Sequence, residues 1–138
     1  MTPEIALQKA IRIRLVGSSE LSGLVPAANI LDTNQRPAPD PSIIIGEGQS
    51  LDENDSISRN LTRVYLDLHV WKREPSTAGV KAIAGAIRAG VKTGKLAAVD
   101  DFHFVDCYVQ SARFLRDPDG EHSHAVVTIN AKVQEIGA

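Results

Sequence analysis

Residues 63–71 read Arg-Val-Tyr-Leu-Asp-Leu-His-Val-Trp, and this stretch decides the fold. Apolar and polar side chains alternate along it without a break, which predicts a β-strand with two different faces. The apolar face consists of Val64, Leu66, Leu68 and Val70. The opposite face consists of Arg63, Tyr65, Asp67, His69 and Trp71. Such a strand fits an antiparallel sheet that packs one face on a core and leaves the other open.

The segments around this strand also have strand character. Residues 104–116 and 121–135 are two strand patterns separated by Asp117-Pro118-Asp119-Gly120. The proline presets a turn φ and the glycine tolerates a positive φ, so the two patterns predict a long hairpin. Residues 42–47 read as a buried strand, and Ile30-Leu31 reads as a short edge strand.

Two helices are expected. Thr2 and Pro3 are good first residues for a helix that ends near Gly17. A second helix follows Ser76 or Thr77 as its cap, because Val80, Ile83, Ala84, Ile87 and Val91 recur at helical spacing. The predicted order is α, β, β, β, α, β, β. This order indicates an α+β fold, with an antiparallel sheet of about four to five strands, two helices packed on one face, and a single domain over residues 1–138.

Two connections are long. Residues 33–41 contain three prolines, which predicts an extended surface loop. Residues 48–60 are polar and acidic without periodicity, which predicts a projecting loop. The acids in and beside this loop are a candidate channel-facing set, and an ordinary solvated tip is the alternative: Glu47, Asp52, Glu53 and Asp55.

Composition limits the function classes. Lysine and arginine number 15 against 17 acids, and the net charge of −2 offers no broad positive field for nucleic acid. One cysteine cannot form an internal disulfide, and the N-terminus lacks a basic region before an apolar run, so we expect synthesis in the cytoplasm. No apolar stretch approaches the roughly 20 residues that a membrane span needs, so no membrane insertion is expected.

A metal site is one candidate chemistry. His122 and His124 lie on the same face of a predicted strand and would need a third ligand such as His69 or Asp67. The sequence does not fix this third ligand, and solvated histidines beside a turn explain the same residues.

The other candidate chemical groups have structural explanations. Cys107 alternates with apolar residues, which predicts a buried and inert thiol. Asp117 and Asp119 resemble an acid–base pair but are explained by the turn. Gly46-Glu47-Gly48 resembles part of a phosphate loop but lacks the third glycine, the lysine and the following helix. We therefore predict no catalytic residues, no metal and no cofactor.

The polar face of the deciding strand is the strongest candidate for a functional surface. Arg63, Tyr65, Asp67, His69 and Trp71 mix aromatic and charged side chains, a composition typical of protein interfaces. We predict a subunit interface there, and an ordinary amphipathic surface is the alternative.

The order of several short motifs resembles a known family. These are Leu7-Gln8-Lys9-Ala10-Ile11, the passage Val25-Pro26-Ala27-Ala28-Asn29-Ile30-Leu31-Asp32, a proline-rich stretch before Ser42-Ile43-Ile44-Ile45-Gly46, Val70-Trp71, and the closing Asp-Pro-Asp-Gly hairpin. Over nearly the whole chain this order is similar to the tail-terminator, or tail-completion, proteins of tailed phages and gene transfer agents.

The resemblance implies a non-enzymatic virion protein at the head–tail junction. Such a protein assembles as a ring, commonly a hexamer, on the tail-tube protein, stops tube polymerisation and presents a docking surface to the head connector, either stopper or adaptor. DNA would pass through the lumen without sequence-specific binding.

Two other function classes remain open. A small-ligand-binding ferredoxin-like module would need an apolar pocket between sheet and helices, for which the Ala- and Gly-rich second helix leaves little room. A metal-dependent hydrolase would need His122 and His124 to hold an ion.

Overall fold

The computed structural model describes residues 1–32, 38–53 and 57–136 of the chain. The helices and strands follow the predicted order, with one short helix and one 3₁₀ turn added. They are α1 (Pro3–Val16), α2 (Ser19–Ser22), η1 (Ala27–Asn29), β1 (Ile30–Leu31), β2 (Ser42–Asp52), β3 (Leu61–Arg73), α3 (Ala78–Lys92), β4 (Phe102–Arg116) and β5 (His122–Glu135). The α+β class is confirmed.

The strands form one five-stranded sheet in the order β1-β2-β3-β5-β4. All pairings are antiparallel except that of β1 with β2, where Ile30 lies opposite Ile43 and Leu31 opposite Ile44 in a parallel register. A tight turn would make two consecutive strands antiparallel. The segment between β1 and β2 is too long for a tight turn, so it can return the chain to form a parallel pair. The sheet is therefore mostly antiparallel, with one short parallel edge.

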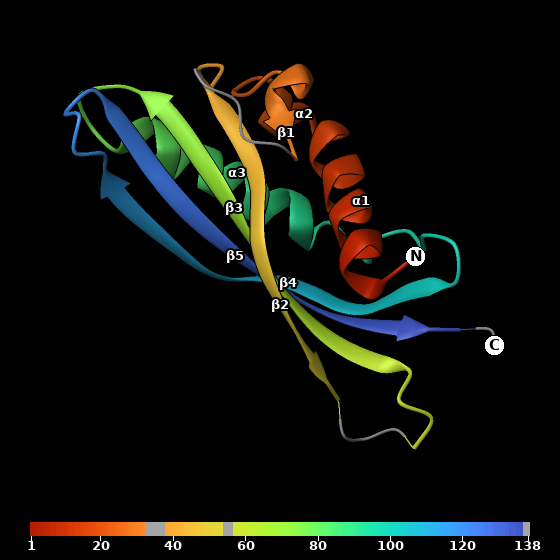
Figure 1. Cartoon of the computed structure of the whole chain (residues 1–138). Coiled ribbons are helices and arrows are strands. Elements are labelled where there is room, and N and C mark those ends of the chain that lie inside the picture. Colours follow the sequence, from red (N-terminus) through yellow and green to blue (C-terminus); the bar gives the residue numbers. More distant parts are fainter. Residues whose placement is uncertain (33–37, 54–56, 137–138) are drawn as a thin grey trace.

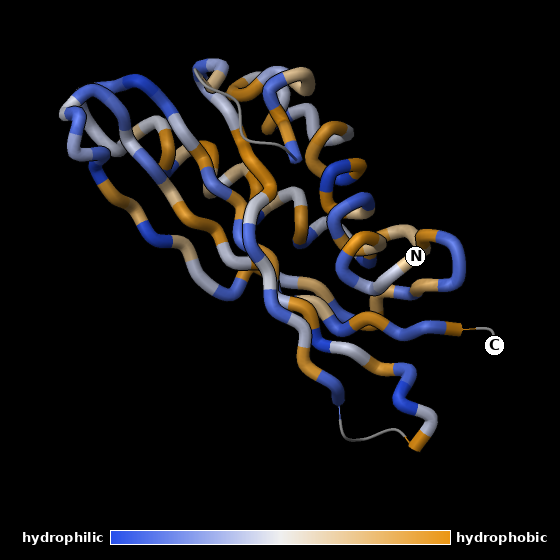
Figure 2. Tube along the Cα trace, viewed as in Figure 1, coloured by the Kyte–Doolittle hydropathy of each residue, from blue (hydrophilic) through white to orange (hydrophobic). Residues whose placement is uncertain are grey.

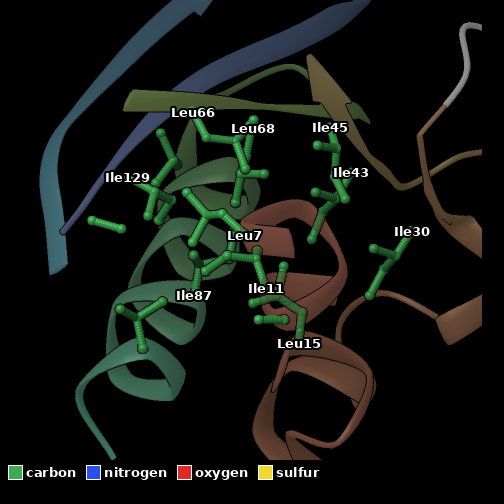
Figure 3. Close-up of a cluster of buried hydrophobic side chains, with 14 of the residues drawn as sticks. Leu7, Ile11, Leu15, Ile30, Ile43, Ile45, Leu66, Leu68, Ile87 and Ile129 are labelled. Atoms are coloured by element: carbon green, nitrogen blue, oxygen red, sulfur yellow. The ribbon is translucent and has the colours of Figure 1, made fainter. Parts of the chain in front are cut away.

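Both long helices cover the same face of the sheet (Figure 1). Apolar side chains of α1 and α3 point toward apolar side chains of β2, β3 and β5, as Figure 3 shows for Leu7, Ile87, Leu68 and Ile129. All four are fully buried. Burying a side chain of this size stabilises a fold by about 1.5–3 kcal/mol, so this layer is the main source of stability.

The predicted cap of α1 is confirmed, whereas the main cap of α3 is a residue that was not predicted. Thr2 Oγ1 accepts a hydrogen bond from the backbone N–H of Ile5, and α1 is followed by Gly17. At the start of α3 the main acceptor is Glu74, whose carboxylate receives the N–H groups of Gly79 and Val80 at 2.8 and 3.0 Å. Thr77 makes no side-chain cap, and Ser76 Oγ accepts only from Ala78. A carboxylate also complements the positive end of the helix dipole, so Glu74 is the stronger cap.

The hairpin of β2 and β3 is longer than predicted. The pairing continues from Ser42↔Trp71 to Asp52↔Thr62, with a bulge between Ile45 and Gly48. The predicted loop at 48–60 thus begins only after Asp52, and residues 54–56 of it lie outside the described residues. Figure 1 shows this hairpin reaching beyond the helices. The end of β2 after Gly46 is exposed, and its side chains are mostly polar. This part of the strand therefore lacks the apolar alternation by which strands were predicted.

Two bulges also change the alternation in β4. The register shifts between Phe104 and Asp106 and again between Val109 and Ser111. Cys107 and Val109 therefore lie on the helix side, whereas Val105 is exposed. Cys107 is half-buried rather than fully buried, and burial raises the pKa of its thiol to about 12, so the prediction of an unreactive thiol agrees with its surroundings.

The turn between β4 and β5 has the predicted structure. Gly120 has a φ of 73°, and its N–H donates to Asp117 O. Asp119 Oδ1 accepts the N–H groups of Glu121 and His122. Hydrogen bonding with these groups lowers the pKa of Asp119 to about 2, so this carboxylate holds the turn.

The other predicted loop is described only from residue 38. Residues 33–37, which contain its first proline, lie outside the described residues. Within the described part, no helix is both long enough and apolar enough to span a bilayer.

Candidate functional site

The sheet face opposite the helices, called the open face below, carries all five predicted interface residues. Along Val64–Trp71 of β3 the helix-side residues are buried and the open-face residues are half-buried. Figure 2 colours the same strand by hydropathy, which alternates between hydrophobic and hydrophilic residues. The open-face set is Arg63, Tyr65, Asp67, His69 and Trp71. Each lies beside a residue of β5, respectively Lys132, Asn130, Thr128, Val126 and His124. These neighbours partly cover the side chains without any second layer.

One chain of contacts on the open face joins a carboxylate, two imidazoles and an indole. Glu47 Oε2 lies 2.8 Å from His69 Nε2, and His69 Nδ1 lies 2.9 Å from His124 Nε2. The His124 ring stacks on Trp71 at a centroid distance of 3.9 Å and an angle of 6°. When His69 Nε2–H donates to Glu47, its Nδ1 accepts the proton of His124 Nε2. The chain therefore orders all four side chains.

The contact chain changes two pKa values. The hydrogen bond from His69 lowers the pKa of Glu47 below its usual 4.5. Burial lowers the pKa of His124 below its usual 6.5, and the neighbouring His69 adds to this effect. The lowered pKa of Glu47 favours its ionised form, and the lowered pKa of His124 favours its neutral form at the other end of the contact with His69.

The candidate metal ligands His122 and His124 are not brought to one site with a third ligand. His122 Nδ1 is 2.6 Å from Asp119 Oδ2 in the turn, whereas His124 contacts His69. Asp67 accepts a hydrogen bond from Thr128 at 2.7 Å. Among the described residues, no three His, Cys, Asp or Glu side chains are placed to hold an ion. The hydrolase alternative thus lacks its third ligand.

A second contact chain crosses the sheet and joins the predicted site residues Glu53 and Arg63 to Asn130 and Gln110, which the sequence did not single out as site residues. Glu53 Oε1 accepts from Arg63 Nε at 2.6 Å, Arg63 Nη1 donates to Asn130 Oδ1 at 2.6 Å, and Asn130 Nδ2 donates to Gln110 Oε1 at 2.8 Å. Asn130 is 97% buried. A polar residue inside an apolar strand pattern was the available signal for Asn130, but nothing in the sequence paired it with Arg63 or Gln110.

Between the two contact chains of side chains lies a shallow, open depression of about 470 Å³. Its lining is mostly polar: Glu47, Gly48, Gln49, Tyr65, Asp67, Gln110 and Thr128. A Cβ added at Gly48 would lie 2.7 Å from Tyr65 O, and one at Gly46 would lie 2.6 Å from His69 Cδ2. These glycines allow close approach of β2 and β3, which explains Gly46-Glu47-Gly48 without a phosphate loop.

Each predicted channel-facing acid that the structure describes lies beside a basic side chain. Glu47 contacts His69, Asp52 contacts Arg59 at 2.8 Å, and Glu53 contacts Arg63. Asp55 lies outside the described residues. The loop therefore carries less unbalanced negative charge than its sequence suggested. Its tip also exposes the whole side chain of Ile57.

The space between sheet and helices is occupied by core side chains. A ferredoxin-like module with a ligand between these layers would need to displace them. The open face, with its two contact chains and its depression, is the better candidate site.

Two solved structures share the fold. One is a chain of the virion of a native gene transfer agent particle, with 18% sequence identity, a TM-score of 0.83, and 96% of this chain and 98% of that chain covered. The other is gp17 of bacteriophage SPP1, with 20% identity, a TM-score of 0.62, and 98% and 94% covered. A comparison with curated protein sequences found no match.

A family model described as tail completion protein gp17 matches residues 9–134, which is most of the chain. The match begins in α1 and ends in β5, so it spans the whole sheet and both long helices. This chain therefore belongs to the tail completion protein gp17 family, whose members are structural proteins of the virion tail.

Proposed function

We propose that the protein is a ring-forming tail terminator that caps the tail tube, stops its polymerisation and joins the tube to the head connector. Family membership over residues 9–134 is the observation that carries this proposal. The likeness to a gene transfer agent virion chain along nearly its full length supports it. The described side chains support an assembly role rather than catalysis, because their polar contacts order a surface and leave no activated nucleophile.

The open face is the proposed contact between subunits of the tail. Arg63, Asp67, His69 and Trp71 are held by hydrogen bonds and stacking, Tyr65 lines the depression, and no described helix covers these side chains. Ordering these side chains in advance reduces the entropy that a partner must remove on binding. A partner that fills the depression beside Tyr65 would bury their remaining exposed surface.

A closed ring, with six copies as the proposed number, accounts for a defined end of the tube. In a head-to-tail ring each subunit offers two different surfaces to its neighbours, and closure limits the number of copies. One side of the ring would contact the tube protein and the other the head connector. DNA would cross the ring without sequence-specific contacts, as the small net charge of −2 allows.

The projecting hairpin of β2 and β3 is the proposed channel-facing element. It reaches beyond the helices and carries Glu47, Asp52 and Glu53, with Asp55 in the part that is not described. Acids near a passing phosphate backbone reduce its adhesion. Because Asp52 and Glu53 pair with Arg59 and Arg63, a test should change the tip without breaking these pairs.

The decisive experiment is deletion of the gene in the particle-producing host. We expect tails of uncontrolled length and heads without attached tails, measured by electron microscopy of negatively stained lysates. Complementation with the intact gene should restore uniform tails. Normal tails in the deletion strain would overturn the proposal.

A further inference from the structure

Two edges of the sheet lack a neighbouring strand among the described residues. On the outer side of β2, β1 covers only Ile43 and Ile44, so Gly48–Asp52 pairs with β3 alone. On the other side of the sheet, β4 pairs with β5 alone. Unpaired N–H and C=O groups at an edge are a template for another strand.

The directions of the two edges are complementary. β2 is antiparallel to β3, β3 to β5, and β5 to β4, so three reversals make β2 antiparallel to β4. If a second copy continues the sheet head to tail, its β4 lies antiparallel to β2 of the first copy. The regular parts are similar in length, because Gly48–Asp52 has five residues and Ser111–Arg116 has six, and each follows the last bulge of its strand.

The side chains restrict the register. Gly48, Ser50 and Asp52 are in line with helix-side residues of β3, whereas Gln49 and Leu51 are in line with Tyr65 and Arg63 of the open face. On β4, Ala112, Phe114 and Arg116 are on the helix side, and Ser111, Arg113 and Leu115 are on the open face. Opposite residues of a sheet point to the same side, so half of all registers are excluded.

The register that aligns the two regular segments most completely pairs Gly48 with Arg116 and Gln49 with Leu115, and it places Ser111 opposite Glu53, one residue beyond Gly48–Asp52. Leu51 then lies opposite Arg113 and diagonal to Leu115, which places two exposed apolar side chains in reach of each other. Glu53 continues the open-face line and lies diagonal to Arg113, so a carboxylate that already pairs with Arg63 in its own subunit also comes near a cation of the next copy. Apolar contact and charge complementarity thus favour the same alignment.

We propose that Gly48–Asp52 of one copy pairs antiparallel with Ser111–Arg116 of the next copy, so that neighbouring subunits of the ring share one continuous sheet. This inference rests on the proposed ring function and identifies the two segments through which neighbouring subunits of the ring contact each other. Edge pairing leaves the open face uncovered, so that face remains available for a further subunit of the tail.

The test uses engineered cysteines in a Cys107→Ala background. One protein carries Gln49→Cys and the other Leu115→Cys, and the two are mixed with purified tail tubes and oxidised. We expect a disulfide-linked dimer in the mixture and none in either protein alone, because the contact joins different segments. Opposite Cβ atoms about 4.5–5.5 Å apart are close to what a disulfide requires.

A Ser50→Cys protein mixed with the Leu115→Cys protein is the matched control. Ser50 is one residue away but points to the helix side, so its cross-linking should be at least tenfold lower. Rings that form on tubes without the Gln49–Leu115 cross-link, or with equal cross-linking of Ser50, would overturn the edge pairing and leave the terminator function intact. Absence of rings together with normal tails in the deletion strain would overturn both.

A second variant tests the charge complementarity. Arg113→Glu places like charges beside Glu53, and we expect at least a tenfold loss of ring occupancy on tubes in electron micrographs. Arg88→Glu, which makes the same change at an exposed site on α3, should leave occupancy unchanged. Equal behaviour of the two variants would contradict the proposed register.

Discussion

His69 Nδ1 lies 2.9 Å from His124 Nε2, although the two residues are 55 positions apart in the chain. β3 and β5 are adjacent and in register, so both rings stand on the open face. The contact needs at least one neutral imidazole, since two imidazolium rings have no acceptor to offer. Acidification that protonates both rings should therefore break this hydrogen bond.

Lower pH should destabilise the protein, partly through His124. Its folded-state pKa lies below 6.5, so the unfolded chain binds this proton more strongly, and the free energy of unfolding falls as the pH drops through 6.5. Glu47 acts in the same direction at lower pH, because its lowered pKa stabilises the fold above 4.5 and this contribution is lost on further acidification. Urea unfolding at about pH 7 and about pH 5 would measure the difference.

His124→Phe keeps an aromatic ring against Trp71 and removes the titration. This variant should lose less stability than the native protein between the two pH values, because the residue whose pKa is lowered in the fold is gone. His103→Phe, at an exposed site on β4, is the control and should keep the native pH dependence. An unchanged pH dependence in His124→Phe would refute the assignment.

Arg14 should contribute strongly to stability through the end of α3. Its guanidinium donates to the carbonyl oxygens of Gly90, Gly94 and Lys95 and to Thr93 Oγ1, at 2.8–3.0 Å. A cation at this end satisfies free carbonyls and the negative end of the dipole. Arg14→Met should cost about 1–3 kcal/mol in urea unfolding. Arg88→Met, on the exposed side of α3, should cost less than about 0.5 kcal/mol.

Two glycines of α3 should respond in opposite ways to alanine. A Cβ at Gly85 meets nothing within 4 Å, so Gly85→Ala should raise the free energy of unfolding by up to about 1 kcal/mol through helix propensity. A Cβ at Gly79 would lie 2.8 Å from Glu74 Oε2 and closer still to the Lys72 side chain. Gly79→Ala should therefore displace the capping carboxylate and give no gain. Thermal unfolding of both variants decides the point.

Tyr65→Lys tests the open face as a subunit contact. The side chain is half-buried and lines the depression, so a charged replacement should block a partner while the core on the other side stays intact. We expect native-like thermal unfolding and at least tenfold weaker binding to tail assemblies in co-sedimentation. Ala89→Lys adds the same charge on exposed α3 and should bind normally. Full binding by Tyr65→Lys would exclude this face.

Ile57→Lys tests whether the hairpin tip faces the channel. Ile57 is fully exposed, so the change adds a cation without breaking the ion pairs of Asp52 or Glu53. In a ring, several added lysines would attract passing DNA, and we expect slower or reduced DNA delivery from normally assembled particles. Ile57→Gln controls for the lost apolar side chain. Equal delivery by both variants would place the tip outside the channel.

Local patterns predicted the parts of this fold that depend on neighbouring residues. Alternation over residues 63–71 located β3, helical spacing located α3, and Asp117-Pro118-Asp119-Gly120 located the last turn. These signals are reliable because backbone geometry repeats every two residues in a strand and about 3.6 in a helix. Family membership followed from the order of such short motifs along the chain.

The sequence by itself therefore determined the element order, the apolar face of each main element and the family. Only the tertiary structure decided the bulges of β2 and β4, the parallel β1, the pairing of Glu53 with Arg63, and the contact of His69 with His124. These features depend on strand register, and register is set by packing between segments far apart in the chain rather than by any local repeat. For the same reason, the two free edges that we propose to join neighbouring subunits could not be recognised before the strands were placed.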